Sequence, residues 1–269
     1  MPSSGDDVIP GRDALSIDGH LESGATVHWA IAEEVPVSLT YNGASSVVMM
    51  ATPQDLEDFA VGFSLTEEMV DSAADIDEVL VSETPVGLLV DILTRPGAVS
   101  SAAQRRRAIA GRTGCGLCGI ESLEDAVRAP RPVTRDFDFD IRAIARAFAD
   151  LRDHQPLNRL NRSVHAAAWA TPDGTIRLAR EDVGRHNALD KLIGALIRQG
   201  LDPAKGMVIM SSRCSFELVQ KAAFVGVPVL ATVSAPTTLA LALARTAGMR
   251  LAALSSEGVV ALDTPAPKD

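Results

Sequence analysis

Two cysteines stand three positions apart in a glycine-rich run, Gly114-Cys115-Gly116-Leu117-Cys118-Gly119. The glycines leave the backbone free and the sulfur atoms unshielded. Arg112 and the arginines at 105–107 raise the local positive potential, which favours the thiolate over the thiol. A thiolate can attack a persulfide, hold its sulfur as Cys–S–SH and pass it on, while a neighbouring thiol stabilises or resolves that state. The pair therefore indicates catalytic sulfur chemistry at Cys115 and Cys118.

A cysteine pair also occurs in other kinds of site. A structural zinc site needs four ligands; the chain has a single pair and no histidine at zinc-finger spacing, so we predict no metal site, although two copies sharing one zinc ion would supply four ligands. A thioredoxin-type pair would begin a helix directly after a strand, unlike this loop. A surface pair without function is the third alternative. With Cys214 the count is three, which is no disulfide framework and fits a reducing compartment.

A charge-dense run extends from Glu181 to Lys191, where six of eleven residues are ionisable. It lies just before and inside an expected helix. Asp182, Arg185, His186 and Asp190 could form a polar pocket with several hydrogen-bond donors, and we also predict His186 and Asn187 as ligand contacts. The alternative is a helix cap with surface salt bridges, which contribute little to stability.

Two turns follow neighbouring strands of the expected sheet, at the carboxyl ends where α/β proteins bind ligands. Backbone N–H groups at a helix start, with serine and arginine side chains, suit an anionic phosphate. The run lacks the Gly-Lys-Ser/Thr ending of a Walker loop, and each turn alone could be no more than a helix N-cap. The predicted phosphate contacts in the two turns are Ser211, Arg213, Ser215, Ser234, Ala235, Pro236 and Thr237.

His165 enters an expected strand as part of His165-Ala166-Ala167. A zinc deaminase would need His-x-Glu and a later Pro-Cys-x-x-Cys, and here Ala167 replaces the glutamate, so deamination is disfavoured. Neither a Gly-x-Ser-x-Gly elbow nor a His-Glu-x-x-His helix is present, which disfavours a hydrolase.

The chain has 269 residues, 46% of them hydrophobic, 22% charged and 4% aromatic, with a formal net charge of −10. An acidic chain repels phosphate backbones, so we predict no nucleic-acid partner. The N-terminus lacks the basic and apolar regions of a signal peptide, and no uncharged apolar run is long enough to span a bilayer. We therefore expect a cytoplasmic protein without membrane association.

The hydrophobic pattern divides the chain into five segments: a disordered tail (1–25), an N-terminal α+β subdomain (26–95), a mobile cysteine-bearing loop (96–120), an α/β domain (121–263) and a second tail (264–269). In the first subdomain we predict strands at 26–31, 35–41 and 46–50, the last two joined by a turn at Asn42-Gly43. A helix then runs to 70 with Thr52 as N-cap, followed by strands at 78–82 and 86–93.

The second half alternates strands with helices, which predicts a mostly parallel sheet with helices on its faces. The expected helices lie at 139–152, 187–199, 215–225 and 237–246, with Gly226 and Gly248 ending the last two. The expected strands lie at 164–170, 175–179, 207–210, 227–232 and 251–254.

Taken together, these runs resemble the FdhD family of formate dehydrogenase accessory sulfurtransferases over about residues 33–254. Besides the cysteine run, the similarity rests on segments that occur in one order: 34–37, 50–63, 165–167, 181–191, 215–222, 228–230 and 234–237. The resemblance implies an α/β fold in which an N-terminal α+β subdomain precedes a cytidine-deaminase-like three-layer α/β/α domain, and it implies a homodimer.

The resemblance also implies a function. Such proteins take sulfur from a cysteine desulfurase as a cysteine persulfide and pass it to the molybdenum of bis-molybdopterin guanine dinucleotide. This molybdenum cofactor is bound for the catalytic subunit of formate dehydrogenase, whose activity depends on the transfer. Cys115 matches the persulfide cysteine and Cys118 the second cysteine of the loop. The cofactor pocket, which a guanine nucleotide alone would also fit, is expected near the dimer interface.

The resemblance further assigns cofactor contact to the stretch Leu254, Ser255, Ser256, Glu257, Gly258 and Val259. Here that stretch lacks the aromatic residue and the arginine usual in the family, and Glu257 adds a negative charge. This departure predicts a difference in the cofactor, its affinity or the client enzyme. Two other functions stay open: a molybdopterin-nucleotide-binding chaperone without sulfur transfer, and a zinc-bridged structural dimer.

Overall fold

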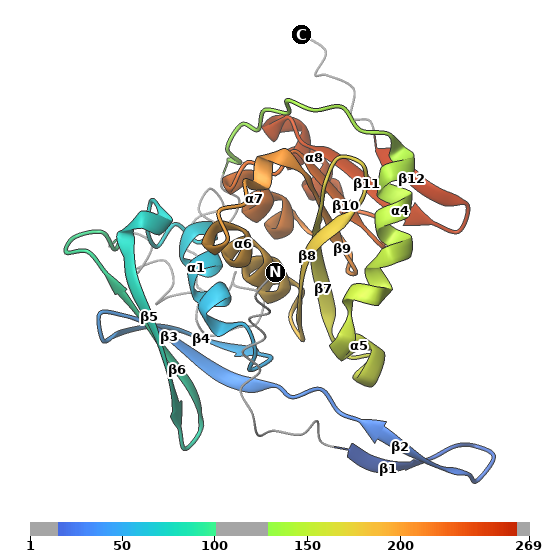
Figure 1. Ribbon diagram of the computed structural model, residues 1–269, viewed down its shortest axis with the longest axis horizontal. Helices are drawn as coiled ribbons and strands as arrows, with labels where there is room; N and C mark the ends of the chain where they lie inside the picture. Colours follow the sequence, from blue (N-terminus) through green and yellow to red (C-terminus); the bar gives the residue numbers. More distant parts are fainter. Residues whose placement is uncertain (1–15, 101–128, 263–269) are drawn as a thin grey trace, which may run out of the picture.

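Two sheets meet through a pair of helices in the computed structural model, which describes residues 16–100 and 129–262 (Figure 1). The smaller sheet consists of β3 (Val35–Tyr41), β4 (Ala44–Ala51), β5 (Ile76–Thr84) and β6 (Gly87–Thr94), in the order β4-β3-β6-β5. Helix α1 (Leu56–Thr66) covers one face of it, and alternate strand residues such as Val37 and Leu39 are buried in the shared core. The Asn42-Gly43 turn joins β3 to β4 with φ angles of 50° and 78°, as predicted.

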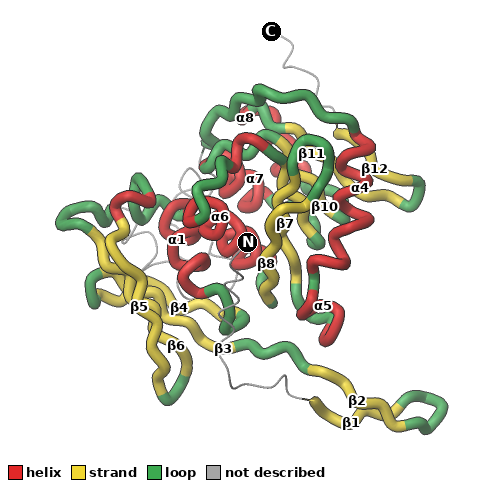
Figure 2. The backbone as a smooth tube through the Cα atoms, viewed as in Figure 1, coloured by secondary structure: helices red, strands yellow, loops and turns green. Residues whose placement is uncertain are grey.

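Two predictions for the first half are wrong. Residues 16–20 were expected in a disordered tail, but they form β1 (Ser16–His20), which pairs antiparallel with β2 (Thr26–Ala30). The turn between them is closed by a hydrogen bond from the backbone N–H of Leu21 to the carbonyl of Ala25. Figure 2 shows this hairpin apart from both larger sheets. Because Ile17 is the one large apolar residue of β1, this strand leaves no hydrophobic pattern in the sequence.

The start of α1 also differs from the prediction. The N-cap is Asp55, with a left-handed φ of 54° and no side-chain cap bond, and the helix ends at Thr66. Thr52 is occupied elsewhere, since its hydroxyl accepts a hydrogen bond from the backbone of Val183 at 3.1 Å and its own N–H donates to Asp182 at 3.0 Å. A tertiary contact therefore replaces the local cap. A short 3-10 turn, η1 (Ala73–Asp75), follows.

The larger sheet has six strands in the order β12-β11-β10-β9-β7-β8. Their bounds are β7 (His165–Ala170), β8 (Ile176–Asp182), β9 (Met207–Met210), β10 (Val229–Thr232), β11 (Arg250–Ser255) and β12 (Gly258–Leu262). The pairs β9–β10 and β10–β11 are parallel, whereas β7 pairs antiparallel with β8 and β9, and β12 pairs antiparallel with β11. The sheet is therefore mixed rather than mostly parallel, because the β7–β8 and β11–β12 connections are short hairpins.

Helices cover both faces of this sheet. On one face lie α6 (Arg185–Arg198), α7 (Phe216–Phe224) and α8 (Thr238–Ala247), and on the other lies α4 (Ile141–Leu151). Along β7, Ala167 and Trp169 face the first group, whereas Ala166, Ala168 and Ala170 face α4. Two 3-10 turns, η2 (Arg152–His154) and η3 (Pro203–Lys205), and the short helix α5 (Pro156–Asn161) complete the described elements.

The two halves join where α1 crosses α6 (Figure 1). A Cβ atom placed on Gly62 of α1 would lie 1.8 Å from the carbonyl oxygen of Asp190, and one on Gly194 of α6 would lie 1.8 Å from that of Asp58. Only glycine allows the backbones to approach so closely. Within 16–100 and 129–262, no helix has the length and apolar character needed to cross a membrane.

Candidate functional site

The carboxyl ends of β9 and β10 bring the two predicted phosphate turns together. Cys214 in the first turn forms a parallel bridge with Pro236 in the second, and the N–H of Thr237 donates to the carbonyl of Cys214 at 3.1 Å. Since β7 runs antiparallel to both β8 and β9, its first residue, His165, lies at the same edge as the end of β8, where Asp182 stands. We call this the carboxyl edge; it collects turns from four separate parts of the chain.

A cluster of basic groups lies on the α6–α7 side of the carboxyl edge. His186 Nε2 is 3.5 Å from the Ser215 hydroxyl and 3.7 Å from the Glu217 carboxylate. Arg185 begins α6 beside them, and its Nε is buried without a hydrogen-bond partner among the described residues. Burial and the charge of Arg213 lower the pKa of Arg185. A desolvated guanidinium with an unused donor suits an anionic ligand.

Glu217 balances part of this positive charge. Its burial alone would raise its pKa, but hydrogen bonds from His186, from Ser215 and from its own backbone N–H outweigh burial and lower the pKa to about 2. The carboxylate is therefore ionised at neutral pH and holds His186 toward Ser215. The structure thus places His186 beside Ser215, and Arg213 within electrostatic reach of Arg185. The sequence singled out all four residues, and the structure adds Glu217.

The acidic residues of the 181–191 run do not belong to this cluster. Asp182 pairs with Lys191 at 2.7 Å, and both side chains are fully buried. Asp190 pairs with Lys221 at 2.8 Å and accepts a hydrogen bond from Thr66 at 2.7 Å. The predicted four-residue pocket is therefore split, and the alternative of surface salt bridges is also wrong, because these pairs lie between the two halves of the molecule.

Asn187 is also occupied in this buried network. Its amide donates to Asp182 at 2.9 Å and to the carbonyl of Met50 at 2.9 Å. Lys191 donates to the carbonyl of Thr52 at 2.9 Å. The first turns of α6 thus fix the loop before α1. The same contacts fix the position of His186, which lies in the first turn of this helix.

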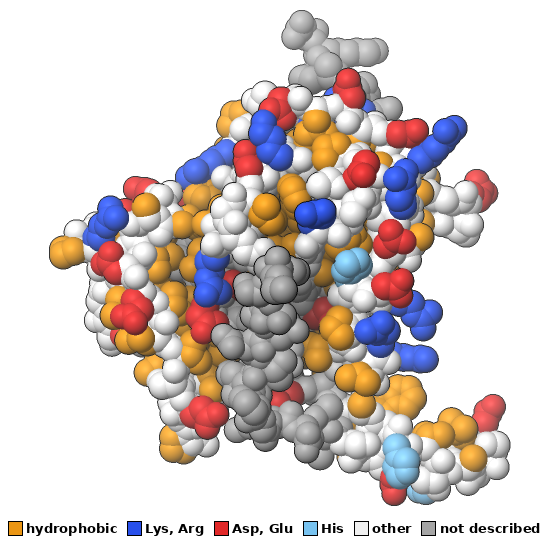
Figure 3. Space-filling model, in the orientation of Figure 1, with side chains coloured by type: hydrophobic (Ala, Val, Ile, Leu, Met, Phe, Trp, Pro, Cys, Tyr) orange, Lys and Arg blue, Asp and Glu red, His pale blue; other side chains and the backbone are white. Residues whose placement is uncertain are grey.

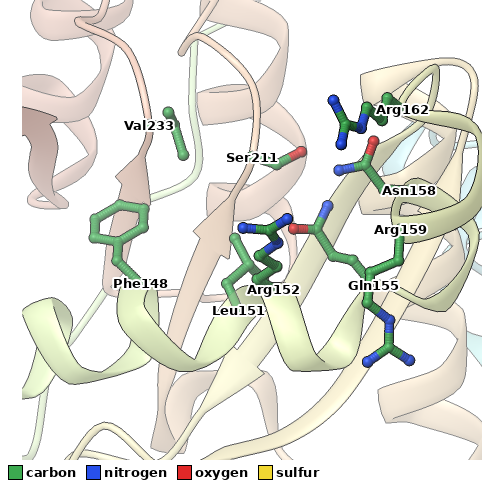
Figure 4. Close-up of a pocket in the computed structure, with 9 residues that line it drawn as sticks. All are labelled: Phe148, Leu151, Arg152, Gln155, Asn158, Arg159, Arg162, Ser211 and Val233. Atoms are coloured by element: carbon green, nitrogen blue, oxygen red, sulfur yellow. The ribbon is translucent and has the colours of Figure 1, made fainter.

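A pocket of about 370 Å³ opens on the other side of the carboxyl edge, between α4, α5 and the strand ends. Figure 4 shows Arg152, Gln155, Asn158 and Arg162 converging toward Ser211, whereas Arg159 points away. Gln155 is 5% exposed, and its Nε2 has no hydrogen-bond partner among the described residues. The remaining lining residues are Phe148, Leu151 and Val233.

This pocket presents two guanidinium groups and two amides to a ligand, a set that suits phosphate oxygens. Figure 3 shows basic side chains gathered beside α5 on this flank of the molecule. Of the predicted contacts, only Ser211 lines the pocket, and its hydroxyl also accepts a hydrogen bond from the N–H of Ala166 at 2.8 Å. Sequence reasoning missed Arg152, Gln155, Asn158 and Arg162; for the last two, the density of Arg and Asn in 158–162 was the available signal.

The other predicted residues are placed as follows. The stretch Leu254–Val259 forms the β11–β12 hairpin, which extends from the carboxyl edge beyond β10. Ser255 and Gly258 close its turn with a 2.8 Å hydrogen bond, and the N–H of Glu257 donates to Ser255. Ser234, Ala235 and Pro236 are exposed or half-buried, and Thr237 caps α8. Cys115 and Cys118 lie outside the described residues.

His165 is half-buried between the two sites, at the start of β7. Burial lowers its pKa, and the positive charges of Arg185 and His186 lower it further. Since folding favours the neutral imidazole, His165 contributes stability that is complete above its ordinary pKa of about 6.5 and is lost as the pH falls below it.

This linkage is testable by NMR titration of the histidine ring signals. The signal that disappears in His165→Gln should titrate with a midpoint below 6.5. The same substitution should flatten the fall in unfolding free energy between pH 6.5 and the measured midpoint. A midpoint at or above 6.5 would show that burial and the neighbouring positive charges do not act on the ring as this arrangement requires.

Comparison with known proteins identifies the family. The chain is 50% identical over 228 residues to the sulfur carrier protein FdhD of Cupriavidus necator (85% of this chain, 79% of the relative). It is 49% identical over 246 residues to the sulfur carrier protein FdhD of Chromobacterium violaceum (90% and 91%). A crystal structure described as a formate dehydrogenase accessory protein from Desulfotalea psychrophila has the same fold, with a TM-score of 0.72 at 22% identity over 93% of this chain and 96% of that chain. The profile of the FdhD/NarQ family matches residues 32–262, and the chain belongs to that family.

Proposed function

We propose that this protein is a cytoplasmic sulfurtransferase that carries sulfur as a Cys115 persulfide. The donor is a cysteine desulfurase, and the acceptor is bis-molybdopterin guanine dinucleotide destined for the catalytic subunit of formate dehydrogenase. Relatives named as sulfur carriers, at 49–50% identity over most of the chain, support this role. We further propose that the protein works as a homodimer and that its six-stranded sheet with its helices corresponds to a cytidine-deaminase-like domain.

The observation that carries the proposal is the carboxyl edge, with an arginine-lined pocket on one side and the Arg185–His186 cluster on the other. A pocket of about 370 Å³ is within the usual range for small-molecule sites. The acceptor is a dinucleotide whose diphosphates need several hydrogen-bond donors. Arg152 and Arg162 would bind phosphate in the pocket, and Arg185 has a buried donor that a second anionic group would satisfy.

The chemistry at Cys115 is thiol–persulfide exchange. Its thiolate attacks the terminal sulfur of the desulfurase persulfide, a new S–S bond forms, and the donor cysteine leaves as a thiolate. No oxidant or reductant is consumed in this step. Cys118 would hold or resolve the persulfide before the sulfur reaches the bound cofactor.

Intact-mass spectrometry tests the carrier role. After incubation with a cysteine desulfurase and L-cysteine, the wild type should gain one or more sulfur atoms that a reductant removes, and Cys115→Ala should gain none. Cys214→Ala is a matched control, because Cys214 is buried and burial raises the pKa of its thiol to about 12. No gain on the wild type with an active desulfurase would favour a cofactor-binding chaperone or a zinc-bridged dimer.

Guanosine diphosphate serves as a probe of the nucleotide pocket. Arg162→Ala should weaken its binding roughly tenfold in isothermal titration calorimetry, since a charged hydrogen bond to phosphate is lost. Arg142→Ala is the control: Arg142 is an exposed arginine of α4 whose ion partner is Asp140. Equal losses in both variants would indicate a general charge effect rather than a site.

A further inference from the structure

Glu181 is a buried acid that none of the sites described above uses directly. It lies in β8, one residue before Asp182, and the alternation of the strand turns the two side chains to opposite faces. Asp182 points to the interface with the first half, whereas Glu181 points to α5. Its two carboxylate oxygens accept hydrogen bonds from the backbone N–H groups of Leu157 at 2.8 Å and Asn158 at 2.9 Å.

With these two bonds, every backbone N–H group in the first turn of α5 has an acceptor. Pro156 occupies the first position and has no N–H. The N–H of Arg159 donates to the carbonyl of Gln155 at 3.0 Å, which leaves Leu157 and Asn158 for Glu181. A helix of six residues is not stable on its own. The position of α5 therefore depends on contacts with the rest of the protein. The carboxylate of Glu181 supplies a charged contact at the start of this helix.

Helix α5 carries one wall of the arginine-lined pocket. Asn158 lies in its first turn, Arg162 follows its last residue with a left-handed φ of 55°, and Gln155 immediately precedes it. Gln155 directs into the pocket its buried Nε2, which has no hydrogen-bond partner within 16–100 and 129–262 (Figure 4). Three of the polar groups that would meet a ligand therefore shift together if α5 shifts.

We infer that Glu181 is a positioning residue for ligand binding: by accepting two N–H bonds it sets the orientation of α5 and so the placement of Asn158 and Arg162 in the pocket. This inference rests on the proposed function, in which the pocket holds a guanine nucleotide. A carboxylate is the side chain that fits this role, because each N–H needs an acceptor and an amide would offer one oxygen and one donor group.

Substitutions at Glu181 and calorimetry with guanosine diphosphate test the inference. Glu181→Ala should weaken binding about tenfold, because both N–H bonds are lost. Glu181→Gln keeps one acceptor and should recover part of that affinity. Asp202→Ala is the matched control, since Asp202 also accepts a backbone N–H, that of Ala204, but in η3. It should bind like the wild type.

The outcomes separate this inference from the proposed function. Binding is measured well below the melting temperature of each variant, so that all are folded. A loss of nucleotide affinity in Glu181→Ala with partial recovery in Glu181→Gln supports the positioning role. Wild-type affinity in Glu181→Ala overturns that role but leaves the pocket as a nucleotide site. If the wild type does not bind the nucleotide, both the assignment of the pocket as a nucleotide site and the positioning role of Glu181 are wrong. If Glu181→Ala does not fold, Glu181→Gln decides: weaker binding at an unchanged melting temperature supports positioning, and unchanged binding overturns it.

Discussion

Lys191→Met is expected to lower the free energy of unfolding by about 3–5 kcal/mol, because it leaves the Asp182 carboxylate buried without its counter-charge. Both side chains are fully buried, so water cannot replace the lost ammonium group. The carbonyl of Thr52 also loses its donor. Urea denaturation followed by circular dichroism measures the change, and the m-value should stay constant.

Lys205→Met is the matched control for this pair. Lys205 is ion-paired with Asp136, but both side chains are more than half exposed, so the substitution should change stability little. The double variant Asp182→Asn/Lys191→Met should recover part of the loss, because no charge is then left unpaired. A loss in Lys191→Met no larger than in Lys205→Met would mean that the buried pair is open to water in solution.

Gly194→Ala is expected to destabilise the protein by about 3 kcal/mol, against the general preference of helices for alanine over glycine. The added methyl would lie 1.8 Å from the carbonyl oxygen of Asp58, so α1 and α6 would have to separate. Gly62→Ala should have a similar effect, because its methyl meets the carbonyl of Asp190 from the other side. Thermal unfolding of the variants measures the effect.

The control for the crossing is Gly19→Ala in β1, where the nearest atom to the new methyl is 3.7 Å away. Its melting temperature should be close to that of the wild type. The double variant Gly62→Ala/Gly194→Ala should cost less than the sum of the single variants, because a separation of the helices that accommodates one methyl also accommodates the other. Unchanged stability in Gly194→Ala would show that the helices are further apart in solution.

Elements with a strong local pattern could be predicted from the sequence. Strand β9 has the expected bounds, α4 lies within its expected range, and Gly226 and Gly248 follow α7 and α8 with φ angles of 77°, as their role in ending helices requires. The elements that could not be predicted have no clear local pattern. Helix α5 is too short to show periodicity, and β12 follows a two-residue turn without a turn motif.

The candidate site shows the same limit. The sequence indicated that His186 and Ser215 lie near each other, because the carboxyl ends of strands collect such residues, and their side chains are 3.5 Å apart. It could not show that Asp182 and Asp190 turn away from His186, because that depends on which residues of α1 and its preceding loop meet α6. Nor could it show that Arg152 reaches the same pocket as Ser211, since these residues are brought together only by packing of α4 on the sheet.

The alternation of β8 restricts how this family can change in length. Glu181 and Asp182 are consecutive residues on opposite faces of the strand. Glu181 accepts a hydrogen bond from α5, and Asp182 accepts one from Thr52 in the loop before α1. Inserting or deleting one residue within the strand would exchange the two faces and break both attachments at once. The turn at 171–175 has a constraint of its own, because Gly174 is buried and a Cβ atom there would lie 2.2 Å from the carbonyl oxygen of Ala143 in α4. We therefore expect insertions and deletions among descendants of this chain to be absent from the last residues of β8.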